Sequence, residues 1–133
     1  MRVSTTILLA APAALLVAAC VPEEVPQVEV FRPVYLGVDT ALLEGDLVRF
    51  RVDMRGARDG QDVQEYADCA AAQYALIRGF GFARHVRTNL SEEGGIQRGD
   101  AVYTVSPAIP GGIRTIDAEV TLAECRMQGI PTV

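Results

Sequence analysis

Apolar and charged residues alternate in the middle of the chain, in the pattern typical of a half-buried β-strand. The alternation runs over residues 46–54. A strand of this kind turns one face to a core and the other to water. The residues predicted to face the core are Val48, Phe50, Val52 and Met54.

The spacing of apolar residues changes to three and four in the next segment, which predicts an amphipathic helix running to Arg78. Asp62, with Glu65 three positions later, fits an acidic form of the capping box, so the helix is expected to begin there. Gly79 is expected to end it. The predicted apolar stripe is Val63, Tyr66, Ala67, Ala70, Tyr74 and Ile77, with Gln64, Glu65 and Asp68 opposite.

Three more strands are predicted after this helix, over residues 80–88, 101–106 and 116–122. The polar, glycine-containing stretch 91–99 reads as a loop. The cluster of proline and glycine at 107–112 reads as a turn that leads into a hairpin. The predicted order of elements is therefore β-α-β-β-β.

Length and composition favour a single folded domain for this order of elements. The 133 residues leave room for one core, and a chain that is 50% hydrophobic and 22% charged is typical of folded proteins. We expect a single α+β domain over residues 34–133, with one helix packed on a mixed four-stranded sheet. A right-handed crossover would join the first two strands.

The first 19 residues have the plan of a secretory leader: Arg2, a short polar stretch, and an apolar run over 7–19. This run is shorter than the roughly 20 residues of a membrane-spanning helix. It ends in Leu16-Val17-Ala18-Ala19-Cys20, which resembles the lipobox of bacterial lipoproteins. The alternative is an ordinary leader that leaves Cys20 free.

The lipobox resemblance implies that the leader is cleaved before Cys20 and that Cys20 is lipidated, which would anchor the protein to a membrane. Val21 follows where Asp would imply retention in the inner membrane, so the resemblance implies the periplasmic face of the outer membrane. The inner membrane is the alternative. Residues 20–33 contain Pro22, Pro26 and Pro33, and they read as an extended tether.

The stretch from residue 28 onward is too apolar to remain in water, and it is predicted to pack on the domain. The alternative is that it offers an exposed edge to a partner as an added strand.

Cys69 and Cys125 form an even pair in a chain expected to reach an oxidising compartment, which predicts a disulfide. A redox-active pair is the alternative, but the Cys-x-x-Cys spacing is absent. Cys125 has the parity of the polar face of the strand predicted at 116–122. A bulge or strand end near Ala123 is therefore expected to turn its thiol toward the helix.

Several segments together resemble a group of alphaproteobacterial lipoproteins of unassigned function. The resemblance covers about residues 47–88 and implies an envelope lipoprotein with no known chemistry. The segments are Val48-Arg49-Phe50-Arg51-Val52-Asp53-Met54-Arg55-Gly56, Asp62-Val63-Gln64-Glu65-Tyr66-Ala67, Ala70-Ala71-Ala72 and Gly79-Phe80-Gly81-Phe82.

The search for catalytic or metal-binding patterns gives no catalytic residue, no metal site and no cofactor. His85 is the single histidine, and neither a nucleophile with an orienting carboxylate nor a zinc ligand set accompanies it in the sequence. It reads as an ordinary strand residue, with a metal, ligand or pH-sensing contact as the alternatives.

The charged residues of the predicted strands are expected to form ion pairs across the sheet. Arg49 and Arg51 would lie with Arg84 or Arg87 and face Asp117 and Glu119. The alternative is a polar docking surface for an acidic partner or a lipid headgroup.

The net charge of -5 argues against a nucleic-acid partner. The sequence favours a membrane-anchored, non-enzymatic binding or structural module of the cell envelope, with an envelope protein as a possible partner. The alternatives are a sensor of envelope state and a cell-wall or lipid hydrolase.

Overall fold

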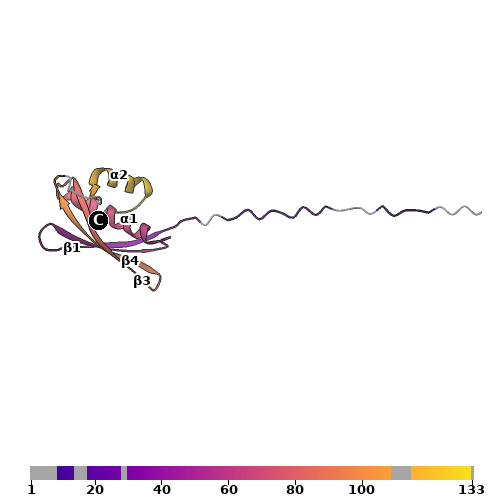
Figure 1. Cartoon of the computed structure of the whole chain (residues 1–133), viewed down its shortest axis with the longest axis horizontal. Coiled ribbons are helices and arrows are strands. Elements are labelled where there is room, and N and C mark those ends of the chain that lie inside the picture. Colours follow the sequence, from indigo (N-terminus) through magenta and orange to yellow (C-terminus); the bar gives the residue numbers. More distant parts are fainter. Residues whose placement is uncertain (1–8, 14–17, 28–29, 109–114, 133) are drawn as a thin grey trace, which may run out of the picture.

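In a computed structural model of the chain, the described residues are 9–13, 18–27, 30–108 and 115–132. They form a sheet of antiparallel strands with both helices, α1 (Gly60–Ile77) and α2 (Ala118–Gln128), on one side (Figure 1). The strands are β1 (Val34–Leu42), β2 (Leu47–Arg55), β3 (Phe82–Glu93), β4 (Ile96–Ser106) and β5 (Thr115–Asp117). The predicted α+β single domain is confirmed.

The order of strands across the sheet is β1-β2-β4-β3-β5, and all neighbouring strands are antiparallel. The prediction of a mixed four-stranded sheet is therefore wrong. The connection β2-α1-β3 does cross over the sheet, but β4 lies between the two strands it joins. The hairpin predicted after residue 107 is also wrong, because β5 pairs with β3 and not with β4.

The core lies between the sheet and α1, and the predicted apolar face of β2 is confirmed as its centre. Phe50 is fully buried, with its ring 5.6 Å from that of Tyr74 and 5.8 Å from that of Tyr103. Gly99 on β4 lets α1 approach closely, because a Cβ there would lie 2.8 Å from a methyl carbon of Val63. Ile77, at the end of the predicted apolar stripe, is instead exposed.

The start of α1 differs from the prediction. Asp59 is the N-cap and accepts from the backbone N–H of Gln61, so the helix begins before Asp62. Asp62 is buried in the first turn, where it accepts hydrogen bonds from the backbone N–H and the guanidinium of Arg58. The hydrogen bonds from the Arg58 side chain hold the pKa of Asp62 below its usual value. The predicted end at Arg78 and Gly79 is confirmed.

Strands β3 and β4 form a long hairpin through residues predicted to be a loop. Gly94 and Gly95 make the turn with φ of +59° and +77°, a conformation that favours glycine. Backbone pairing continues on both sides of the turn, so the predicted loop at 91–99 is wrong. Polar side chains hid these strand ends, because neither face carries enough apolar surface there to produce an alternating pattern.

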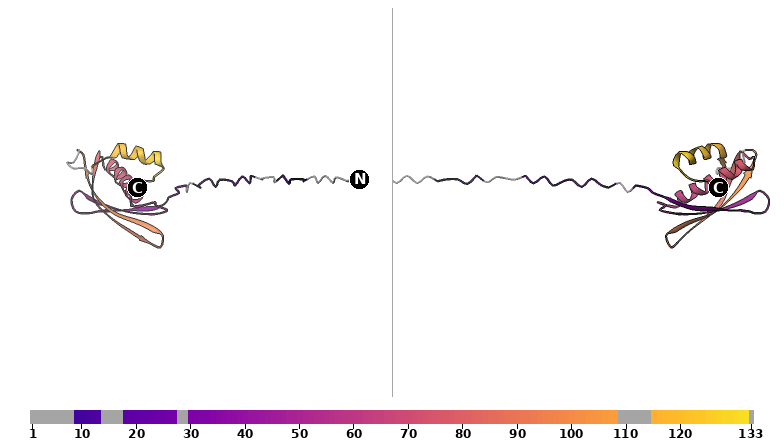
Figure 2. Two further views of the ribbon diagram at one scale, coloured as in Figure 1. Left: turned by 45° about the vertical axis from the view of Figure 1, so that its right-hand side comes forward. Right: turned by 180° about the vertical axis from the view of Figure 1, so that it is seen from behind.

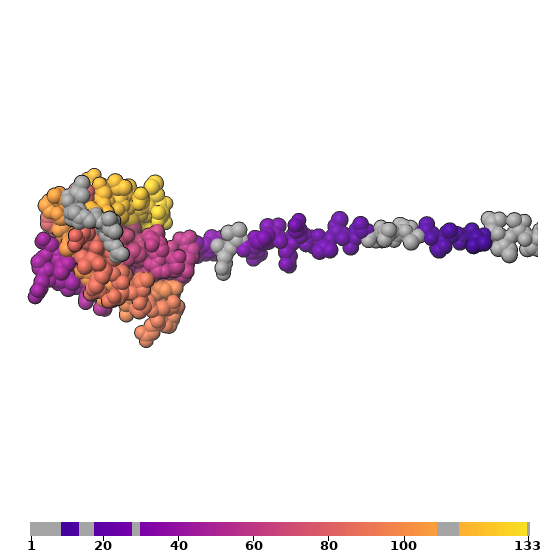
Figure 3. Space-filling view, viewed as in Figure 1, coloured from indigo at the N-terminus to yellow at the C-terminus, as the bar shows by residue number. Residues whose placement is uncertain are grey.

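Strand β1 is an edge of the sheet and pairs only with β2 among the described strands. The apolar stretch before residue 43 thus packs on the domain as a strand. Ahead of it, the guanidinium of Arg58 lies 3.8 Å from the ring centre of Phe31, which holds the end of the predicted tether against the domain. The described residues 18–27 are exposed and stand clear of the globular part (Figure 3).

The strand predicted at 116–122 is wrong beyond Asp117. Asp117 is the N-cap of α2 and accepts from the backbone N–H groups of Glu119 and Val120. Helix α2 lies over α1, so sheet, α1 and α2 form successive layers (Figure 2). Among the described residues, neither helix is both long and apolar enough to cross a membrane.

The disulfide between Cys69 and Cys125 is confirmed, and it joins α1 to α2 with their Cα atoms 6.0 Å apart. The bulge expected near Ala123 is wrong, because Cys125 lies on a helix. Helical spacing places it on the same buried side as Leu122, facing α1.

Candidate functional site

A β-bulge at Val86 decides which side chains of β3 face the helices and which face away. The pairing of β3 with β4 shifts between His85 and Arg87, so Val86 is an extra residue in the strand. His85 and Thr88, three positions apart, therefore both face α1, and Arg87 faces the opposite side. Without the bulge, Arg87 would have the parity of His85 and would point toward the helices.

On the helix side, the bulge completes a half-buried polar network formed by Gln64, Asp68, His85, Thr88 and Tyr103. The Gln64 Nε2 group donates to Asp68 Oδ1 at 2.8 Å and to the Tyr103 hydroxyl at 2.9 Å. The Tyr103 hydroxyl donates to Asp68 Oδ1. The Thr88 hydroxyl donates to Gln64 Oε1 at 2.6 Å, and His85 Nε2 lies 2.6 Å from Thr88 Oγ1. The network links α1 to β3 and β4, the two strands of the hairpin.

The direction of each hydrogen bond follows from Asp68. Its Oδ1 accepts from both Gln64 and Tyr103, so the Gln64 amide nitrogen must face it and the amide oxygen must face Thr88. The Thr88 proton is then committed to Gln64, and Thr88 Oγ1 is left to accept. His85 must therefore carry a proton on Nε2.

The electrostatics of the network agree with these directions. Burial raises the pKa of Tyr103, and the neighbouring charge of Asp68 raises it further, so the phenol keeps its proton and remains a donor. Burial also raises the pKa of Asp68, and the hydrogen bonds from Tyr103 and Gln64 offset part of that rise.

This arrangement braces the fold and does not resemble a nucleophilic site. The Thr88 hydroxyl donates to an amide oxygen, so it does not donate to His85 as an activated nucleophile would. A hollow of about 390 Å³ opens beside the network, lined by Gln61, Gln64, Asp68, His85, Thr115 and Ile116. Within the described ranges, no group of three or more His, Cys, Asp or Glu side chains could hold a metal ion. His85 is thus more than an ordinary strand residue, because it is part of this network.

The raised pKa of Asp68 leads to a prediction for Asp68→Asn. The folded protein binds this proton at higher pH than the unfolded chain, whose usual value is 3.8, so ionised Asp68 costs stability above the folded-state pKa. Asn keeps an oxygen for Tyr103 and Gln64 and cannot ionise. We expect the stability of the variant relative to the parent to increase as pH rises from near 4 to neutral, measured by urea unfolding across pH. Asp39→Asn, which removes an exposed carboxylate on β1, controls for net charge. A constant difference across pH would contradict the prediction.

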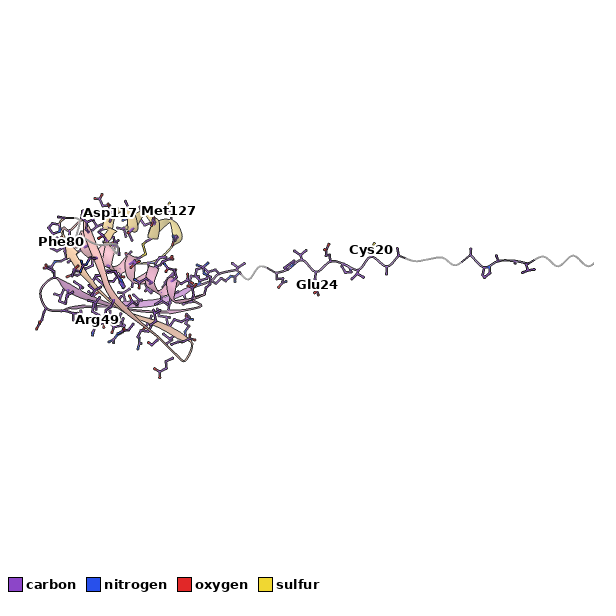
Figure 4. The ribbon with its side chains drawn as sticks, viewed as in Figure 1. Cys20, Glu24, Arg49, Phe80, Asp117 and Met127 are labelled. Carbon is purple, nitrogen blue, oxygen red and sulfur yellow. A yellow bond between two sulfur atoms is a disulfide. The ribbon has the colours of Figure 1, made fainter. Side chains whose placement is uncertain are left out.

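The opposite side of the sheet, here called the open face, carries the arginines expected from the sequence. The expected ion pairs of Arg49 and Arg51 with Asp117 and Glu119 are wrong, because the Asp117 carboxylate caps α2 and Glu119 lies in the first turn of that helix. Figure 4 shows Arg49 on the side of the sheet away from Asp117 and Met127. The register of the strands now shows which of these arginines are neutralised by neighbours.

Two arginines of the open face have acidic neighbours in register. Arg98 on β4 makes a two-pronged salt bridge to Asp53 on β2, with its Nε 2.6 Å from Asp53 Oδ1. This pairing holds the pKa of Asp53 below its usual value. Arg51 pairs in register with Asp39 on one side and Asp100 on the other. Positive charge is therefore balanced in these two rows.

A third row of the open face has no acidic member. It runs Ala41, Arg49, Val102 and Arg87 across β1, β2, β4 and β3. Val102 is only 3% exposed although it faces away from the helices and lies outside the main core cluster. Its register neighbours are Arg49 and Arg87, and long arginine side chains can cover an apolar neighbour with their aliphatic stems. Among the described residues, neither arginine has a carboxylate oxygen within 4.0 Å.

Of the other residues singled out in the sequence, Cys20 is exposed with a free thiol in the extended segment. Gly79 follows the end of α1 with φ of +78°, and Phe80 donates its N–H to the Ala75 carbonyl, which is a helix C-cap. The half-buried polar network was not predicted. The positions of Gln64 and Asp68, four residues apart on the polar flank of the helix, were the one signal of it in the sequence.

Comparison with known proteins identifies relatives of this chain. The sequence profile of the YNQ4 C-terminal domain matches residues 35–129. The uncharacterized 26.9 kDa protein in the nqo8 5' region of Paracoccus denitrificans is 35% identical over 85 residues, which are 64% of this chain and 33% of that protein. The chain thus spans about a third of the length of this relative. No solved structure matches. The expected similarity to uncharacterised alphaproteobacterial proteins is confirmed, and the lipoprotein part of it stays a prediction.

Proposed function

The chain belongs to the YNQ4 C-terminal domain family, and on that premise we propose that it is a lipid-anchored, non-enzymatic binding module of the cell envelope. The leader and lipobox support attachment through Cys20 to the periplasmic face of the outer membrane. The domain then stands at the end of the tether and binds an acidic partner through its open face.

The observation that carries this proposal is an unbalanced pair of positive charges on the open face. The chain is acidic, with a net charge of -5, yet the row that contains Arg49 and Arg87 has no acidic member. Two uncompensated cations on the side that no described helix covers favour binding of an anionic surface. The polar network on the other side supports a non-enzymatic role, because its donors are already committed to partners within the fold.

Replacing Cys20 by Ser tests the anchor. The hydroxyl cannot form the thioether to a diacylglycerol, so we expect the protein to move from the membrane fraction to the soluble periplasmic fraction or to remain as an unprocessed precursor. Fractionation of cells, with mass spectrometry of the N-terminus, measures both outcomes. Ala123→Ser in the same chain is the matched control, because it introduces a hydroxyl at an exposed position of α2 outside the lipobox and should leave fractionation unchanged. Retention of the Cys20→Ser chain as a processed membrane protein would contradict the proposal.

A further inference from the structure

We infer that Arg49 and Arg87 form a binding site for the phosphate groups of anionic phospholipids, in the same leaflet that holds the anchor. This inference rests on the proposed function and names the partner of the open face. It begins from the spacing of the two arginines across the sheet. Their strands are separated by β4, so their backbones lie about 10 Å apart.

The chemistry of this pair fits phosphate. A guanidinium donates two parallel hydrogen bonds to phosphate oxygens and is more weakly hydrated than an ammonium, so it transfers readily to a lipid headgroup. Val102, which is only 3% exposed, lies between the two arginines in register. Thr104, which lies on the same face of β4 two residues further along, adds a hydroxyl beside them.

The bulge at Val86 supports a binding role for the row that contains Arg49 and Arg87. It interrupts the pairing of β3 in mid-strand and turns Arg87 away from the helices. Bulges occur often beside binding sites, where they redirect a side chain. One backbone irregularity thus places Arg87 opposite Arg49 and at the same time builds the polar network that fixes β3 to α1.

The tether favours the membrane over a soluble acidic protein as the occupant. Phe31 is held by Arg58, so at most the ten residues 21–30 separate the domain from Cys20. Ten residues reach at most about 35 Å when fully extended, which is close to the diameter of a domain of this size. The domain therefore stays within about its own width of the lipid surface, where the net negative charge of the chain is repelled and the row of Arg49 and Arg87 is attracted.

The test uses the mature chain, residues 20–133, with Cys20→Ser, so that binding does not depend on the anchor. Co-sedimentation is measured with vesicles of phosphatidylcholine, with and without phosphatidylglycerol. We expect binding to the anionic vesicles only, and weaker binding at high salt. Each arginine near an anionic surface contributes about five-fold, so Arg49→Gln with Arg87→Gln should lower partitioning roughly 25-fold.

Arg78→Gln with Arg126→Gln is the matched control. It removes the same charge from the ends of α1 and α2, on the helix side, and partitioning should fall less than about three-fold. Circular dichroism checks that all variants fold. Arg87→Gln alone, at an exposed position, keeps the test valid if the double variant unfolds, and it should lower partitioning about five-fold.

Three outcomes would overturn the inference. Equal losses in both double variants would mean that net charge alone drives binding. Displacement of the chain from the vesicles by inorganic phosphate, at a concentration equal to that of the lipid phosphate, would identify a small anion as the ligand. Binding to polyglutamate but not to anionic vesicles would identify an acidic protein as the partner. None of these outcomes affects the anchor, which the fractionation of Cys20→Ser tests separately.

Discussion

Replacing Cys69 and Cys125 together by alanine is expected to lower the free energy of unfolding by about 4 kcal/mol. The disulfide joins residues 56 apart in sequence, and a cross-link over a loop of that length removes much of the conformational freedom of the unfolded chain. The loss should be large, because a small domain has a total stability of only about 5–15 kcal/mol. Urea unfolding of the mature chain, followed by circular dichroism, measures it.

Reductant gives an independent check of the disulfide. The parent chain should lose a similar amount of stability in reductant, and the double alanine variant should lose nothing further. Cys20→Ala, outside the domain, should leave the midpoint unchanged. A decrease below about 1 kcal/mol in the double variant would show that packing of α2 on α1 holds the layers together without the cross-link.

Replacing Phe50 by alanine is the second large effect, with an expected loss of about 3–5 kcal/mol. Phe50 is fully buried and lies edge-to-face against Tyr74 of α1 and Tyr103 of β4. Its removal leaves a cavity where α1 meets the sheet, and the neighbouring Tyr103 is also part of the half-buried polar network. Urea unfolding measures the change.

Leu42→Ala is the matched control for Phe50→Ala. It also truncates an apolar side chain on a strand, but Leu42 is 66% exposed at the edge of the sheet. The expected change is within about 0.5 kcal/mol. Equal effects at the two positions would contradict the assignment of Phe50 to the centre of the core.

The parts of the fold that the sequence predicted are those with one clear periodicity. The face of β2 and most of the stripe of α1 are buried as expected, because each element turns one side to the same core. The alternation of Ile116, Ala118, Val120 and Leu122 was misleading. Only Ala118 and Leu122 of this set are buried on α2, and a spacing of four fits a helix as well as a strand.

The candidate sites needed information that a single strand or helix does not contain. The polar network combines α1, β3 and β4, and its residues meet only once the register of the hairpin is fixed. The row of Arg49 and Arg87 depends on that register and on the bulge at Val86. A bulge changes the parity of all later residues, and no glycine or proline marks this one in the sequence.

The position of Cys125 in the sequence determines when the disulfide can form. Cys125 belongs to α2, so during synthesis its partner on α1 must wait until the five described strands have been made. The native cross-link therefore cannot form in a fragment that ends before α2. Oxidation comes after the strands of the sheet are available, and it fastens α2 onto the layers beneath it.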